Sequence, residues 1–160
     1  MTINHEFRGR RPSRLSAAIQ NLITAIHTFI YRLTRGAVGG SIVNSPVLLL
    51  TTSGRRSGKP RTVPLLYLAD GDRVVLVASN GGAARHPAWW LNLQANPEAR
   101  IEIDGGRRKV IAELAAAEEK QRLWPLLTAM YAGYGRYQEI TDREIPVVIL
   151  RSLRNTPGPG

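Results

Sequence analysis

The stretch TVPLLYLADGDRVVLVAS, residues 62–79, contains two short apolar runs on either side of an aspartate-glycine pair. Residues 62–69 and 73–79 are rich in valine, leucine and other residues that favour strands. An Asp-Gly pair between such runs is typical of the tight turn that joins two antiparallel strands. Residues 62–79 therefore predict a β-hairpin that turns at Asp70-Gly71.

Further β-type runs flank this hairpin, over residues 47–52, 100–104, 107–114 and 145–151. Six short strands joined mostly by tight turns, with few long helices between them, are typical of an antiparallel sheet that closes into a small barrel. The sequence therefore predicts a mainly β fold with flanking helices.

The N-terminal region predicts an amphipathic helix, because residues 15–33 carry apolar side chains at helical spacing between Ser13 and Gly36. Polar residues interrupt this apolar run, so we expect that the chain does not span a membrane. Two shorter helices are predicted, one opened by Pro87 and one over residues 115–130.

Composition limits the chemistry of the chain. With 160 residues, 43% of them hydrophobic, we expect a single domain over 1–160, with an arm and helix in residues 1–36 and the barrel in 45–152. The 22 lysines and arginines against 12 acidic residues give a formal charge of +10, which predicts an anionic partner: nucleic acid, a membrane surface or a polyanionic cofactor. The absence of cysteine excludes disulfides, thiolate metal sites and cysteine nucleophiles.

Motifs for metal binding or hydrolysis are missing. The three histidines, His5, His27 and His86, lie far apart in the sequence, and neither HExxH nor GxSxG occurs. We therefore expect no metal site. A basic chain without obvious reactive side chains favours chemistry carried by a bound cofactor.

Residues 51–61, TTSGRRSGKPR, combine two glycines with four cations between two predicted strands. The glycines allow the backbone to present N–H groups, and the cations donate charge-assisted hydrogen bonds to phosphate or carboxylate oxygens. The candidate ligand-binding residues are Arg55, Arg56, Ser57, Lys59 and Arg61. A solvated basic loop explains the composition equally well.

Two other segments are candidates for a site. Ala78-Ser79-Asn80-Gly81-Gly82 ends a strand in a turn that suits the close approach of a flat ring, although such turns are common at strand ends. Tyr131, Tyr134 and Tyr137 are spaced to share one helical face, which is usually a core stripe. Gly133 and Gly135 disfavour a long regular helix there and favour a pocket-lining segment. Trp89, Trp90 and Asn92 are packing residues by default.

Three ordered blocks resemble the deazaflavin (coenzyme F420)-dependent nitroreductase family, a split-barrel group related to flavin-binding proteins of the pyridoxamine-phosphate-oxidase type. The blocks are LLLTTSGRRSGKPRTVPLLYLADGDRVVLVASNGG (48–82), HPAWWLNLQANP (86–97) and LWPLLTAMYAGYGRYQEITDREIPVVIL (123–150). The resemblance implies a six-stranded antiparallel split β-barrel that binds F420. It also implies hydride transfer from the reduced deazaflavin to an organic acceptor.

The resemblance also implies roles for individual residues. The anionic tail of F420 would contact Arg55, Arg56, Ser57, Lys59 and Arg61. The ring and linker would contact Ala78, Ser79, Asn80, Pro87, Trp89 and Asn92. The acceptor side would be lined by Tyr131, Tyr134 and Tyr137, with Ser79 and Tyr134 polarising the acceptor.

Two positions depart from the family's nitroreductase pattern. Leu66 stands where a pocket tyrosine is expected, and Asn80 stands where a lysine is expected. Leucine donates no hydrogen bond to a nitro group, whereas a quinone tolerates an apolar wall. We therefore expect quinone reduction ahead of the reduction of nitroaromatic or nitroimidazole compounds.

Alternatives remain at the level of sequence. A flavin mononucleotide enzyme on the same barrel would also use a basic phosphate-binding loop, and the charge is compatible with a non-catalytic nucleic-acid-binding barrel. Few aromatic residues lie on the predicted strands, which disfavours nucleic acid. We expect a cytoplasmic protein, and the arginines of the N-terminal arm suggest a peripheral contact with anionic membrane, or else a helix packed on the barrel.

Overall fold

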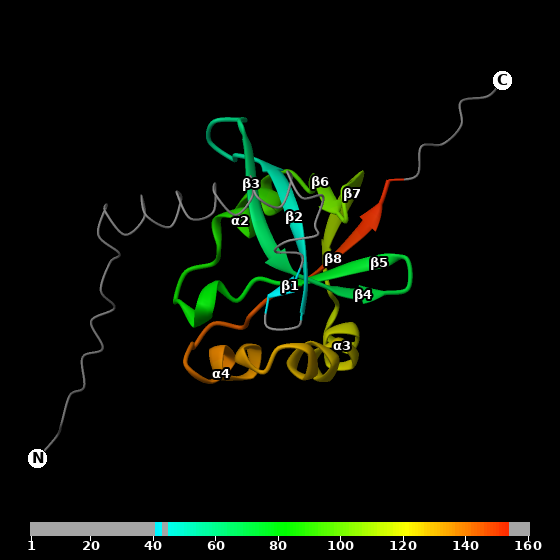
Figure 1. The fold of residues 1–160 in the computed structure, drawn as a ribbon. Helices are drawn as coiled ribbons and strands as arrows, with labels where there is room; N and C mark the ends of the chain where they lie inside the picture. Colours follow the sequence, from blue (N-terminus) through cyan, green and yellow to red (C-terminus); the bar gives the residue numbers. More distant parts are fainter. Residues whose placement is uncertain (1–40, 43–44, 154–160) are drawn as a thin grey trace, which may run out of the picture.

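The computed structural model describes residues 41–42 and 45–153, and Figure 1 shows how their strands form one curved sheet. All strand pairs in the described part of the chain are antiparallel. The strands are β1 (Ser41–Ile42), β2 (Ser45–Ser53), β3 (Pro60–Leu66), β4 (Leu68–Asp70), β5 (Arg73–Val77), β6 (Glu98–Ile103), β7 (Gly106–Leu114) and β8 (Val147–Ser152).

The order of the strands explains how the barrel closes. Neighbours along the sheet are β1-β2-β6-β7-β8-β5-β4, and β3 pairs with the free side of β2. Because β3 and β4 are separated only by Tyr67, one run of chain pairs first with β2 and then with β5. The N–H of Tyr67 donates to the carbonyl of Pro46 at 3.1 Å. The predicted strand over residues 62–69 is therefore two strands with different partners. With the five other predicted strands it forms the split barrel, and the structure adds the two-residue strand β1, which was not predicted.

Side chains on the two faces of the sheet form two separate hydrophobic clusters, because neighbours along a strand point in opposite directions. On β5, Val74 and Leu76 belong to the cluster inside the barrel, which α2 (Ala88–Ala95) covers with Trp89 and Trp90. Val75 and Val77 belong to the other cluster, which α3 (Ala117–Met130) covers. The strand pattern thus explains why helices are needed on both faces.

The helices follow the sequence signals with one difference. Pro87 is the N-cap of α2, and Pro125 lies inside α3. Residues 133–139, where we expected no long regular helix, form the seven-residue helix α4 (Gly133–Glu139) after a break at Tyr131. A Cβ on Gly133 would overlap the ring of Tyr131, so glycine allows the ring to fold back against the start of the helix.

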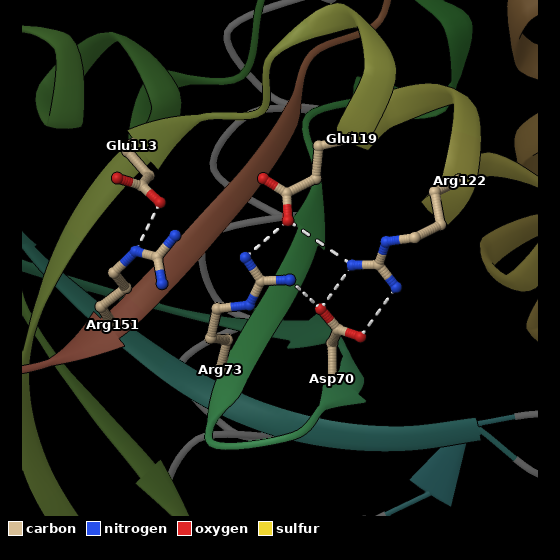
Figure 2. Close-up of polar contacts among 6 residues, drawn as sticks. All are labelled: Asp70, Arg73, Glu113, Glu119, Arg122 and Arg151. Atoms are coloured by element: carbon tan, nitrogen blue, oxygen red, sulfur yellow. Dashed lines mark hydrogen bonds and ion pairs between the residues drawn. The ribbon is translucent and has the colours of Figure 1, made fainter.

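An ion network joins α3 to the β4–β5 hairpin (Figure 2). Its members are Asp70, Arg73, Glu119 and Arg122. The carboxylate of Asp70 accepts from Arg122 at 2.8 and 3.1 Å and also from Arg73. A separate pair joins Arg151 to Glu113 across β7 and β8 at 2.6 Å.

The predicted N-terminal arm and its helix, residues 1–36, lie outside the described residues. Of the helices in the described ranges, none is long and apolar enough to cross a membrane.

Candidate functional site

A groove of about 690 Å³ lies between the β2–β3 hairpin and α2. Its walls are charged on the hairpin side and partly apolar on the helix side. The lining residues are Thr52, Gly54, Arg55, Arg56, Ser57, Pro60, Arg61, Thr62, Val63, Ala88, Trp89 and Asn92. Most of the predicted phosphate-binding residues therefore face one hollow.

The cation loop, residues 54–61, has a compact backbone held by its own hydrogen bonds. The N–H of Gly54 donates to the carbonyl of Lys59 at 2.8 Å, and the N–H of Gly58 donates to the carbonyl of Gly54 at 2.7 Å. Gly58 adopts a φ of 67°, which a residue with a Cβ adopts only with strain. The hydroxyl of Ser57 accepts from the Lys59 N–H at 3.3 Å. The loop is therefore shaped before any ligand binds.

Asn92 fastens the cation loop to α2. Its side-chain oxygen accepts from the backbone N–H of Arg55 at 3.1 Å, and its amide nitrogen donates to the hydroxyl of Thr52 at 3.0 Å. Asn92 and Thr52 are 4% and 2% exposed. From the sequence alone we predicted that Asn92 is a packing residue, and the family resemblance implied a contact with the cofactor. The structure shows that Asn92 is a buried polar link between the two walls of the groove.

The cations of the loop lack acidic partners among the residues that the structure describes. Arg55, Arg56, Lys59 and Arg61 are exposed, and none of them forms an ion pair with a residue in the described ranges. Uncompensated cations around one groove create a strong positive potential for an anionic ligand.

The Ser79 turn, residues 78–82, follows β5 and has an unusual backbone conformation. Asn80 has a φ of 48°, and its side-chain nitrogen donates to the carbonyl of Arg85 at 2.9 Å. Gly82 has a φ of 78°, and a Cβ there would lie 2.7 Å from Ile140. The positive φ and the closeness of the Tyr137 carbonyl, 3.1 Å from the position of a Cβ, favour glycine where this turn meets α4.

Ser79 itself is 8% exposed, and its hydroxyl forms no hydrogen bond with any residue that the structure describes. A buried polar group without a partner is unfavourable by about 1–3 kcal/mol. This hydroxyl is therefore a strong candidate to bind a ligand atom.

The tyrosine cluster, Tyr131, Tyr134 and Tyr137, lies at the junction of α3 and α4. The hydroxyls of Tyr131 and Tyr137 are 3.1 Å apart, and the rings of Tyr131 and Tyr134 meet edge to face with centroids 5.1 Å apart. Tyr134 is 5% exposed and belongs to the hydrophobic cluster beneath α3. Burial raises the pKa of Tyr134, and the two neighbouring phenols raise it further. Tyr134 therefore stays protonated near neutral pH.

The structure brings the predicted residues together in two groups. The groove gathers Arg55, Arg56, Ser57, Arg61, Trp89 and Asn92. Five predicted residues do not line the groove. Lys59 lies on the cation loop, and Ala78, Ser79, Asn80 and Pro87 lie between β5 and α2; of these, Ala78 shares the interior cluster with Trp89. The second group is the tyrosine cluster, which shares a hydrophobic cluster with Leu66 and meets the Ser79 turn through α4.

Arg143 is a residue of this region that the sequence did not reveal. Its guanidinium donates to the carbonyls of Ala78, Ser79 and Ala83 and to the ring of His86. A lone arginine between two acidic residues in a loop carries no motif, so no sequence signal pointed to it.

Comparisons with known proteins show which family this chain is similar to. A family model described as F420H(2)-dependent quinone reductase matches residues 23–152. An F420H(2)-dependent quinone reductase of Mycobacterium tuberculosis (strain ATCC 25618 / H37Rv) is 41% identical over 129 residues, which cover 78% of this chain and 87% of that protein.

Solved structures give the same result. The structure of an F420-H2 dependent reductase is 37% identical, with a TM-score of 0.62, and the match covers 66% of this chain and 94% of that chain. A structure described as a domain-swapped dimer is 32% identical, with a TM-score of 0.64, over 83% of this chain and 99% of that chain. The resemblance to deazaflavin-dependent reductases is thus confirmed, and the chain belongs to the F420H(2)-dependent quinone reductase family.

Proposed function

We propose that this chain is an oxidoreductase that binds F420 in the groove and transfers a hydride from the reduced cofactor to a quinone. The observation that carries the proposal is the groove itself, in which three arginines face an apolar wall that contains Trp89 and have no acidic partner within residues 41–42 and 45–153. This combination among the described residues suits a ligand with both an anionic tail and a flat ring.

Two features support the fit of F420 to these residues. Arg55, Arg56, Lys59 and Arg61 supply more charge than a single phosphate requires, which suits a cofactor with a phosphate and a chain of carboxylates. The buried hydroxyl of Ser79 has no partner in the described part of the chain and would gain one from a ring or acceptor atom.

When bound, reduced F420 supplies a hydride to the acceptor, and one proton then completes the hydroquinone. The cation loop holds the anionic tail, and Trp89 and Asn92 border the linker. Ala78, Asn80 and Pro87 shape the edge of the ring site. Ser79 donates a hydrogen bond to the acceptor oxygen, and the tyrosine cluster lines the acceptor side, where its hydroxyl groups act as donors.

A quinone is favoured over a nitro compound because of the wall formed by Leu66. This side chain is half-buried and packs against the cluster that contains Tyr134. It stabilises an apolar ring but donates no hydrogen bond to a nitro group.

Cofactor identity is tested by titrating the protein with oxidised F420, following tryptophan quenching with flavin mononucleotide as the competitor. We expect tight binding of F420 and little competition. Selective binding of flavin mononucleotide would mean that the flavin, and not F420, is the cofactor. Binding of neither, together with a salt-dependent shift on an oligonucleotide, would favour the nucleic-acid alternative.

The acceptor is tested by comparing turnover of menadione with turnover of nitroaromatic and nitroimidazole compounds at saturating reduced F420. Faster turnover of menadione supports the assignment. Good turnover of nitro compounds with none of quinones would contradict it.

The contact with anionic membrane predicted for residues 1–36 stays a prediction, and flotation of the protein with anionic liposomes tests it.

A further inference from the structure

The loop that follows β5 is held from one side by a single side chain. Arg143, in the segment between α4 and β8, is partly buried. Its Nε donates to the carbonyl of Ala83 at 2.8 Å, one terminal nitrogen donates to the carbonyl of Ser79 at 2.6 Å, and the other contacts the carbonyl of Ala78 and Nδ1 of His86, both at 3.2 Å. Four of its five N–H groups are thus used within one loop.

All four acceptors are neutral, and Arg143 forms no ion pair with a carboxylate in the described ranges. Its charge is therefore not compensated locally. Hydrogen bonds from a charged donor are about twice as strong as those between neutral groups, so the guanidinium fixes this loop firmly. Other cations of the same half of the chain, such as Arg122 and Lys120, have acidic partners.

The contact with His86 also fixes its protonation. A guanidinium can only donate, so Nδ1 of His86 accepts, and the ring is neutral with its proton on Nε2. Burial lowers the pKa of His86, and the charge of Arg143 lowers it further, which agrees with a neutral ring.

The bonded carbonyls have chemical consequences for their peptide groups. The carbonyl of Ala78 shares its peptide group with the N–H of Ser79, and the carbonyl of Ser79 shares its group with the N–H of Asn80. A strong donor on the oxygen polarises the whole peptide group and strengthens its N–H by cooperativity, by about 10–30% per bond. The N–H of Ser79 donates to no acceptor in the described part of the chain, so it is available to a ligand.

We propose that Arg143 is a positioning residue of the F420 site. It holds the loop from Ala78 to His86 in the shape that receives the ring. It also polarises the N–H groups of Ser79 and Asn80, which then donate to acceptor atoms of the ring. This inference rests on the proposed function. It adds a residue from outside the groove that acts through backbone groups and does not touch the ligand.

The test uses R143A and R143K with R151A as the matched control, since Arg151 is an arginine paired on the surface with Glu113. We expect R143A to bind oxidised F420 about ten-fold or more weakly, because several charge-assisted hydrogen bonds are lost. R143K keeps the charge but lacks the planar fork, so it is expected to bind nearly as weakly as R143A. R151A is expected to bind like the wild type.

Two readouts separate positioning from mere stability. Millimolar methylguanidinium should restore much of the affinity of R143A, whereas ethylammonium should not. In 15N NMR spectra of the ligand-free protein, His86 should be neutral with Nε2 protonated in the wild type and should lose that state in R143A. If R143A does not fold, R143K serves for the F420 titration and for the NMR readout on His86.

The outcomes are distinguishable. Unchanged F420 affinity in R143A and R143K, while the wild type binds F420, would overturn this inference and leave the proposed function intact. Weak binding that methylguanidinium fails to restore in a folded R143A would also overturn it. Failure of the wild type to bind F420 would overturn the proposed function, and the role inferred for Arg143 toward F420 would fall with it.

Discussion

The arginines at the two ends of the barrel have different surroundings. Figure 1 shows α3 and α4 at one end and the β2–β3 loop projecting at the opposite end. Beside α3, Arg73 and Arg122 contact the carboxylates of the ion network (Figure 2). On the cation loop, Arg56 and Arg61 have no acidic partner among the described residues. Paired charges fasten elements to one another, whereas unpaired charges are available to a ligand.

The strongest test of this contrast removes two unpaired charges. In R56Q/R61Q, we expect the affinity for oxidised F420 to fall about 100-fold or more, since each lost charge-assisted hydrogen bond is worth about 1.5–3 kcal/mol. The free energy of unfolding should change by less than about 0.5 kcal/mol, because both side chains are exposed. Tryptophan quenching and urea unfolding measure the two quantities.

The matched control is R108Q/R151Q, which removes the same charge from β7 and β8. An equal loss of affinity in the control would mean that F420 responds to net charge and not to the cation loop.

The second test concerns the neutral link that shapes the cation loop. In N92A, the buried partners Thr52 and the N–H of Arg55 lose their hydrogen bonds, so we expect the protein to be destabilised by about 1–3 kcal/mol. F420 affinity should fall as well. Q94A, an exposed position on the same helix, is the control. A normal urea midpoint for N92A would show that the loop keeps its shape without this link.

The third test concerns the ion network at the end of the barrel beside α3. Hydrogen bonds from Arg122 and Arg73 lower the pKa of Asp70 from 3.8 to about 2. In D70N, we expect a loss of about 1 kcal/mol of stability at pH 7 with unchanged F420 affinity. Because the pKa is lower in the folded state, the stabilisation by Asp70 is present above pH 3.8 and is lost as the pH falls toward 2.

Urea unfolding of D70N and wild type at pH 7 and at pH 2.5 checks this dependence. The difference between them should shrink at the lower pH. A difference that stays constant with pH would argue against an ionic origin.

The smallest effect is expected for the exposed pair of Arg151 and Glu113, whose side chains are 47% and 46% exposed. Solvent screens such a pair, so R151Q should change the free energy of unfolding by less than about 0.5 kcal/mol. Thermal unfolding at low and high salt measures it. If R151Q lowered the free energy of unfolding as much as D70N does, the ion network would be no more stabilising than an isolated exposed pair.

Much of the fold was predictable because its signals are local. Two short apolar runs and the Asp70-Gly71 pair between them specify the β4–β5 hairpin, and Pro87 marks the start of α2. The switch of pairing at Tyr67, from β2 to β5, was not predictable. The apolar pattern continues through that residue and does not indicate which strand lies beside it. Helix α4 was missed because its two glycines oppose a helix locally, while packing against the Ser79 turn stabilises it.

The candidate site was predictable to a similar degree. The composition of the cation loop indicates an anion, and the groove gathers most of its residues. The contacts of Asn92 and Arg143 involve partners far away in the sequence: Asn92 is 37 residues from Arg55, and Arg143 is 64 residues from Ser79. Contacts of this kind appear only once the chain is folded.

The passage of one strand from β2 to β5 at Tyr67 bears on where the chain tolerates inserted residues. Extra residues at the β4–β5 tip near Gly71 would extend an exposed turn and leave the pairing on either side intact. One residue inserted at Tyr67 would turn every side chain of β4 to the opposite face, because the direction alternates along a strand. Leu68 would then leave the cluster beneath α3 that it now joins. Natural or engineered variation in length is therefore expected at the hairpin tips and not at this crossing.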